Sequence, residues 1–169
     1  MDGKVYGLLG RTLGHSWSVP IHQALAELTG RQAIDLDTKI VEKAGCSIPE
    51  IFAQQGEAGF RALEREVTAE WGKTSGNILI TGGGVVKSPE NYASLHQNGR
   101  IYQLLRPLDT LPTDGRPLSQ GADLNAMWTE RAPLYRRFAD AVMDNSGSIS
   151  ETAQAIWRDF CETSGSERA

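Results

Sequence analysis

Short apolar runs alternate along the chain with longer stretches in which apolar residues recur every three or four positions. The run on which this pattern centres is Ile-Leu-Ile at 78–80, followed by Thr81 and by three consecutive glycines at 82–84. A run of this length between polar residues predicts a buried parallel strand. Glycines at its carboxyl end let the backbone approach a ligand, although a plain strand-to-helix turn accounts for them equally well.

Four other short runs predict strands, and the periodic stretches between them predict helices. The strands are expected at 5–9, 33–34, 101–105 and 142–143. The helices are expected at 18–29, from a start at 47–50, and at 58–71, 89–97, 125–141 and 148–162. Strands that alternate with helices predict an α/β fold, in which helices cover both faces of a mostly parallel sheet.

Composition narrows the class of protein. The 169 residues and their apolar content suit one globular domain with its own core. A net charge of −4 without a long basic run argues against a nucleic-acid partner. No apolar run is long enough for a signal peptide or a membrane span, and two distant cysteines suit a reducing compartment. We therefore expect a cytoplasmic monomer with one domain over 1–163 and a polar, frayed tail over 164–169.

Two carboxylates, Asp35 and Asp37, stand two positions apart just after the second predicted strand. In strand geometry both side chains would point to the same face. Paired carboxylates there suit Mg²⁺ binding through water and the binding or deprotonation of a hydroxyl group. The competing explanation is an N-cap for the following helix, and it is a strong one for Asp37.

Three arginines, Arg61, Arg116 and Arg131, differ from the other basic residues because each lies beside glycine, proline or an aromatic residue. Such neighbours restrict the backbone, which helps to build a fixed fork for a carboxylate or a phosphate. Taken singly, each arginine is equally well explained as a solvated surface residue. The three become informative only together with the carboxylates and the glycine turn.

Six segments, in the same order and with similar spacing, resemble shikimate kinase, a small kinase of the nucleoside-monophosphate-kinase type. They are IDLD at 34–37, SIPEIF at 47–52, GEAGFR at 56–61, TGGG at 81–84, RPL at 116–118 and RAPLY at 131–135. The resemblance runs from about residue 33 to residue 163. It implies a three-layer αβα sandwich of the P-loop kinase type. It also implies ATP-dependent phosphorylation of the 3-hydroxyl of shikimate, a step in aromatic amino-acid (chorismate) biosynthesis.

The resemblance also implies how the substrate would be held. Asp37 would bind the ring hydroxyls of shikimate and act as the base toward the attacking one. Arg61 and Arg131 would clamp the shikimate carboxylate. The glycine turn would offer backbone N–H groups to the ring from Gly82, Gly83 and Gly84.

The nucleotide side of the site departs from the family pattern. A kinase of this class needs G-x-x-x-x-G-K-[ST] after its first strand to cradle phosphate and hold Mg²⁺. Here Gly10 follows the strand, but the nearest match, Gly14-His15-Ser16, is one residue short and has histidine for lysine. Since an imidazole replaces a fixed ammonium poorly beside phosphates, we expect these residues to bind ATP weakly.

Three further roles on the nucleotide side are implied. Asp35 and the Ser16 hydroxyl would hold Mg²⁺. Arg116 would lie on a mobile lid over 106–120 and contact the phosphates during catalysis.

Residues 5–30 resemble the opening of a different enzyme, shikimate dehydrogenase. The matching segments are YGLLG at 6–10 and LGHSWSVPIH at 13–22. This resemblance implies that Ser16 and Ser18 hydrogen-bond the shikimate carboxylate. The chain therefore resembles a kinase body with an atypical, dehydrogenase-like opening over 1–32.

The expected function is that of a shikimate kinase with shikimate, ATP and Mg²⁺ as its small-molecule partners. The alternative is a shikimate-binding, catalytically impaired remnant of a dehydrogenase–kinase fusion. A dehydrogenase remnant is disfavoured because the chain has no G-x-G-x-x-G dinucleotide fingerprint.

Overall fold

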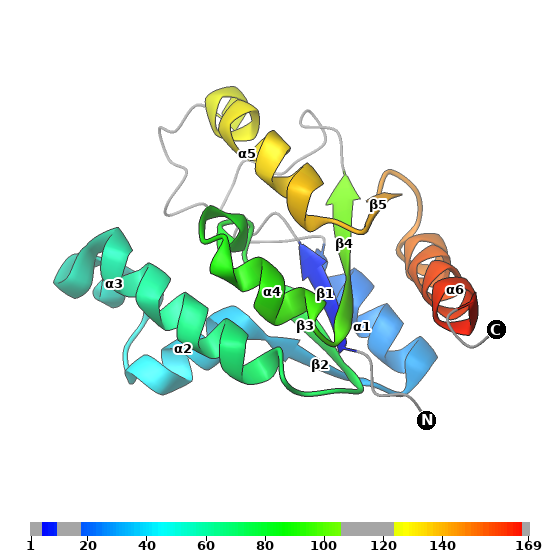
Figure 1. The fold of residues 1–169 in the computed structure, drawn as a ribbon, viewed down its shortest axis with the longest axis horizontal. Helices are drawn as coiled ribbons and strands as arrows, with labels where there is room; N and C mark the ends of the chain where they lie inside the picture. The colour runs from blue at the N-terminus through cyan, green and yellow to red at the C-terminus, as the bar shows by residue number, and fades with distance from the viewer. Residues whose placement is uncertain (1–4, 10–17, 106–123, 167–169) are drawn as a thin grey trace.

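The computed structural model describes residues 5–9, 18–105 and 124–166. Its centre is a five-stranded sheet in the order β2-β3-β1-β4-β5 (Figure 1). The strands are β1 (Val5–Leu9), β2 (Gln32–Asp35), β3 (Asn77–Thr81), β4 (Gly99–Leu105) and β5 (Ala141–Asp144). Every pairing is parallel, which confirms the expected parallel sheet.

Helices cover both faces of this sheet and give three layers (Figure 1). One face carries α1 (Ser18–Thr29) and α6 (Ile149–Ser166). The other carries α2 (Leu36–Ala44), α3 (Ile48–Trp71), α4 (Glu90–His96) and α5 (Leu124–Phe138). Each crossover joins parallel strands through at least one helix, which is the expected solution for a parallel sheet.

Neighbouring residues of the strands alternate between two apolar cores. In β3, Ile78 packs with α1 and α6, whereas Leu79 packs with the helices of the opposite face. In β4, Tyr102 packs with α1 and α6, and Ile101 packs with the helices of the opposite face. All four side chains are fully buried. A strand buried on both faces is apolar at most of its positions, which explains the short apolar runs in the sequence.

Several element boundaries differ from the prediction. The prediction had no helix over 36–44, yet α2 begins directly after β2. The predicted helix 125–141 ends at Phe138 because Asp140 leaves the helix, and its N–H bonds to the Ile101 carbonyl of β4. The last helix continues through Ser166, so the predicted frayed tail is helical for its first residues.

The helix start at Ser47 is confirmed, and it leads into a kinked helix. The Ser47 N–H donates to the Glu50 carboxylate over 2.8 Å, as a capping box requires. Within α3, Gly56 has φ 68° and ψ −173° and divides the helix into two segments. A left-handed φ is easily adopted by glycine alone, so this residue sets where the second segment, with Arg61, begins.

Candidate active site

Asp35 and Asp37 do not share a strand face, which corrects the expectation from strand geometry. Asp35 ends β2 and is the N-cap of α2, where its Oδ1 accepts the N–H of Asp37 over 2.8 Å and that of Thr38 over 3.2 Å. Asp37 lies in the first turn of the helix. The cap is therefore Asp35 rather than Asp37, and the side chain of Asp37 is not consumed by capping.

Asp37 lies in an environment that favours its protonated form. Burial, and then the negative charges of Asp35 and Glu64, raise its pKa to about 6, while the positive charge of Arg61 opposes them. A carboxyl group in this range is ionised near neutral pH and binds a proton more strongly than an ordinary aspartate does. These properties suit a general base.

Arg61 and Glu64 form a tight pair on the second segment of α3. Arg61 Nη1 lies 2.8 Å from both carboxylate oxygens of Glu64. The side chains are 15% and 5% exposed, respectively. Burial raises the pKa of Glu64, although Arg61, Arg65 and Arg131 all favour its charged form. The pair fixes the Arg61 guanidinium, because a buried carboxylate needs its cation close by.

The guanidinium of Arg61 lies against the glycine turn that follows β3. A Cβ atom on Gly84 would stand 2.6 Å from Arg61 Nη2 and 2.7 Å from Nη1. None of the three glycines has a positive φ. At Gly84, a larger residue would therefore have to displace the Arg61 guanidinium, although the backbone conformation itself does not demand glycine.

Helix α5 brings a second arginine to the same place. The Tyr135 hydroxyl donates a buried 2.6 Å hydrogen bond to the Gly83 carbonyl and so holds α5 over the turn. Arg131 lies one helical turn earlier, within electrostatic range of Glu64. Its Nε atom is buried and has no hydrogen-bond partner among the residues that the structure describes. A buried guanidinium N–H without a protein partner favours an anionic ligand at this point.

Four elements therefore converge on one site. Asp37 comes from α2, Arg61 from α3, Gly84 from the turn after β3, and Arg131 from α5. The turn follows the carboxyl end of a parallel strand, which is where open α/β sheets bind their ligands. Two arginines and a proton-accepting carboxylate suit a ligand that carries an anionic group and a hydroxyl group.

Among the site residues expected near the start of the chain, the structure describes Ser18 alone, which was expected to bind the shikimate carboxylate. Ser18 is the first residue of α1, where the sequence predicts this helix to begin. The predictions that fall outside the described ranges are the lid 106–120 and the residues Gly10, Gly14, His15, Ser16 and Arg116.

The described part of the chain contains no preformed cluster of metal ligands. It holds no group of three His, Cys, Asp or Glu residues that could bind a metal ion. The Oδ1 atom of Asp35 is occupied by two backbone N–H groups, and its Oδ2 atom accepts no hydrogen bond from the described residues. One such oxygen fits Mg²⁺ held mostly by water and phosphate, which is the usual environment of this ion in kinases.

The described helices include none long and apolar enough to cross a bilayer.

Sequence reasoning missed two residues of the site, Glu64 and Tyr135. Glu64 resembled the other charged residues of its helix, yet it occupies a buried stripe with Phe60, Val67 and Thr68. Spacings of three and four residues put these positions on one helix face, so the pattern contained the signal. Tyr135 follows Arg131 by four residues, and that spacing also places two residues on one face.

The geometry agrees with what the comparisons with known proteins find. The family description "Shikimate kinase" matches residues 20–161. A shikimate kinase of Synechococcus sp. (strain CC9605) is 42% identical over 142 residues, which are 78% of this chain and 71% of that protein. One of Stenotrophomonas maltophilia (strain R551-3) is 38% identical over 144 residues, 80% of each chain.

Among solved structures, shikimate kinase from Acinetobacter baumannii in complex with shikimate has a TM-score of 0.83 and 31% identity. The match covers 96% of this chain and 95% of that one. Shikimate kinase from Aquifex aeolicus, with a TM-score of 0.79 and 23% identity, supports the fold alone.

Proposed function

The chain belongs to the shikimate kinase family, and we propose that it transfers the γ-phosphoryl group of ATP to the 3-hydroxyl of shikimate. The observation that carries this proposal is the convergence of Asp37, Arg61 and Arg131 beside the glycine turn, with the buried Arg131 Nε lacking a partner in the described part of the chain. Support also comes from the Acinetobacter baumannii relative, whose structure was solved with shikimate.

In this proposal the two arginines bind the shikimate carboxylate from two sides. Arg61 is already fixed by Glu64, so its fork keeps its orientation when substrate arrives. Arg131 brings from α5 its Nε–H, which has no hydrogen-bond partner among the described residues. The backbone of Gly82, Gly83 and Gly84 faces the ring. The binding energy serves chiefly to position the ring hydroxyl in line with the phosphoryl group.

Asp37 then acts as the general base. As the 3-hydroxyl oxygen forms its bond to the γ-phosphorus and the bond to the ADP oxygen breaks, the hydroxyl proton passes to the Asp37 carboxylate. A pKa of about 6 keeps Asp37 ionised at neutral pH and still basic enough to accept this proton. Mg²⁺, when bound with ATP, supplies positive charge for the phosphates. We assign its protein contacts to Asp35 and Ser16, and a phosphate contact to Arg116.

The opening of the chain is the second part of the proposal. The loop Gly10 to Ser18 has histidine where the family motif has lysine, and we assign it weak nucleotide binding. Ser16 and Ser18 then belong to a dehydrogenase-like opening on a single kinase-like domain over 1–163. A neutral imidazole leaves the phosphates without the fixed cation that phosphoryl transfer uses.

A coupled ADP-release assay with and without shikimate, followed by mass analysis of the product, tests the first part. We expect ADP release to depend on shikimate and to yield shikimate monophosphate. A chain that binds shikimate by calorimetry but releases no ADP would contradict the kinase assignment. The shikimate-binding alternative would then hold.

Grafting a G-x-x-x-x-G-K-S-T loop in place of residues 10–18 tests the second part. A well-placed cation is worth roughly 3–4 kcal/mol, by analogy with a single oxyanion-stabilising group. We therefore expect at least about a hundredfold faster turnover in the graft. Circular dichroism checks that both proteins are folded. The loop assignment fails if the folded graft is no faster, or if the unmodified chain already turns over at an ordinary rate of roughly 1–100 per second.

A further inference from the structure

A charged pair outside the proposed site contacts Arg61 from the side away from Glu64. Lys87 lies just beyond the glycine turn, and its Nζ is 2.8 Å from Oε1 of Glu57. The same oxygen lies 3.4 Å from both Nε and Nη2 of Arg61. Glu57 therefore stands between two cations and is bound closely to only one of them.

The two distances indicate which cation holds Glu57. Charge-assisted hydrogen bonds between nitrogen and a carboxylate are usually 2.7–2.9 Å long. The contact to Lys87 falls within that range, and the contacts to Arg61 are clearly longer. The hydrogen bond from Lys87 is also the largest reason why the pKa of Glu57 is lowered. Lys87 thus keeps the carboxylate ionised and turned toward itself.

Without Lys87, the geometry of the helix would turn Glu57 against Arg61. Glu57 and Arg61 are four residues apart on α3, the spacing at which opposite charges pair along a helix. Arg61 would then have close carboxylates on both sides, Glu64 and Glu57. A substrate carboxylate would have to displace one of them.

We propose that Lys87 is a positioning residue for substrate binding, which pairs with Glu57 and so keeps Arg61 available to the substrate carboxylate. This inference rests on the proposed function, because it presumes that Arg61 binds the shikimate carboxylate. The pair itself contributes little to the fold. Glu57 is 53% exposed and Lys87 is 29% exposed, and exposed pairs of this kind add little to stability.

Calorimetric titration of shikimate without nucleotide tests the proposal, because a second substitution, Glu57→Gln, should restore the binding that Lys87→Ala weakens. We expect Lys87→Ala to raise the Kd about threefold to fivefold, the scale of one exposed ion pair competing for Arg61. Glu57→Gln alone should leave the Kd unchanged or lower it. The double variant should return to within about twofold of the unmodified protein, because the competing carboxylate is gone. Lys87→Arg should bind like the unmodified protein.

Two controls separate this local effect from net charge. Lys43→Ala removes the same charge from a lysine that pairs with Glu66 and Glu70 elsewhere on α3, and it should leave the Kd unchanged. Glu66→Gln, combined with Lys87→Ala, restores the net charge without touching Arg61 and should not rescue binding. Thermal unfolding checks that every variant is folded.

The outcomes distinguish the inference from the proposed function. If the unmodified chain binds shikimate and Lys87→Ala binds equally well, the inference is wrong and the function stands. If both single variants and the double variant weaken binding equally, the pair is only a structural bridge and the inference is again wrong. If the unmodified chain does not bind shikimate, both fail.

Discussion

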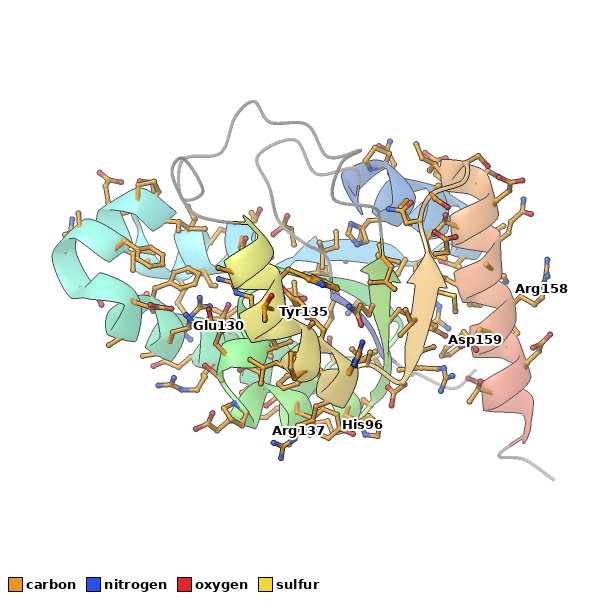
Figure 2. All side chains as sticks on the ribbon, turned by 90° about the horizontal axis from the view of Figure 1, so that it is seen from above. His96, Glu130, Tyr135, Arg137, Arg158 and Asp159 are labelled. Carbon is orange, nitrogen blue, oxygen red and sulfur yellow. The ribbon has the colours of Figure 1, made fainter. Side chains whose placement is uncertain are left out.

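The hydroxyl of Tyr135 donates a 2.6 Å hydrogen bond to the carbonyl of Gly83, and this buried bond joins α5 to the glycine turn. Tyr135→Phe removes the donor and leaves the Gly83 carbonyl without this partner. We expect a loss of about 1–3 kcal/mol in the free energy of unfolding, measured by urea denaturation. Because Arg131 lies one turn away on α5 (Figure 2 labels Tyr135 on this helix), shikimate binding should weaken as well. Unchanged stability and unchanged affinity would show that the bond does not hold the helix in place.

Substitutions at two crowded glycines should have opposite effects, one on substrate binding and the other on stability. The three atoms nearest to a Cβ on Gly84 would all belong to the guanidinium of Arg61, whereas a Cβ on Gly72 would stand 2.1 Å from the backbone oxygen of Ser94. Gly84→Ala should displace Arg61 and raise the Kd for shikimate at least about tenfold, with a small change in stability. Gly72→Ala should instead destabilise the fold by more than about 1 kcal/mol, because backbone cannot give way, and leave the Kd unchanged. Equal effects of the two variants on binding would contradict the placement of Arg61.

The pH dependence of activity should report Asp37. Its pKa of about 6 means that the base is protonated below that pH. We expect kcat/KM to fall about tenfold per pH unit below pH 6 and to level off above it. Asp37→Asn should remove most of the activity and retain shikimate binding at acid pH, where the unmodified residue is also neutral. A profile that is flat from pH 5 to pH 8 would exclude Asp37 as the base.

Two buried groups should give opposing contributions to stability in acid. His22 is buried in α1, and its two ring nitrogens have no hydrogen-bond partner in the described part of the chain. Burial lowers its pKa from 6.5 to about 4. Between these values the unfolded chain binds the extra proton, so His22 costs stability as the pH falls. For Asp37, raised from 3.8 to about 6, the folded chain binds the extra proton, so stability rises as the pH falls through that window.

The variants should separate these contributions. Asp37→Asn removes the Asp37 contribution, and the free energy of unfolding of this variant should fall by about 3 kcal/mol between pH 6.5 and pH 4 relative to the double variant Asp37→Asn/His22→Leu. Asp37→Asn should also be more stable than the unmodified chain at pH 7, by about 2–3 kcal/mol, and no more stable below pH 4. Urea titrations at a series of pH values measure both. Parallel stability profiles for the two variants would contradict the burial of His22, and parallel profiles for Asp37→Asn and the unmodified chain would contradict that of Asp37.

The sequence predicted the sheet well because strands buried on both faces are mostly apolar, and such runs stand out at 78–80 and, apart from Gln103, at 101–105. It failed at α2, where Asp35 ends the strand and caps the helix in a single residue. No loop separates the two elements, so Asp37 was assigned to strand geometry. Glu64 was missed because a glutamate in a charged helix resembles a solvated residue. In the structure Glu64 is buried on the stripe of α3 that faces the core, and its charge is balanced by Arg61 three residues earlier on the same helix.

The central claim is that Arg131, whose Nε lacks a partner within the described residues, binds the carboxylate of shikimate. The most direct measurement is the calorimetric titration of shikimate into Arg131→Ala, with Arg137→Ala as the control. Arg137 lies on the same helix, exposed, and Figure 2 shows it at the periphery of the molecule. We predict that Arg131→Ala weakens binding by about 2–5 kcal/mol, while Arg137→Ala binds like the unmodified chain. Equal affinity in all three proteins would contradict the account.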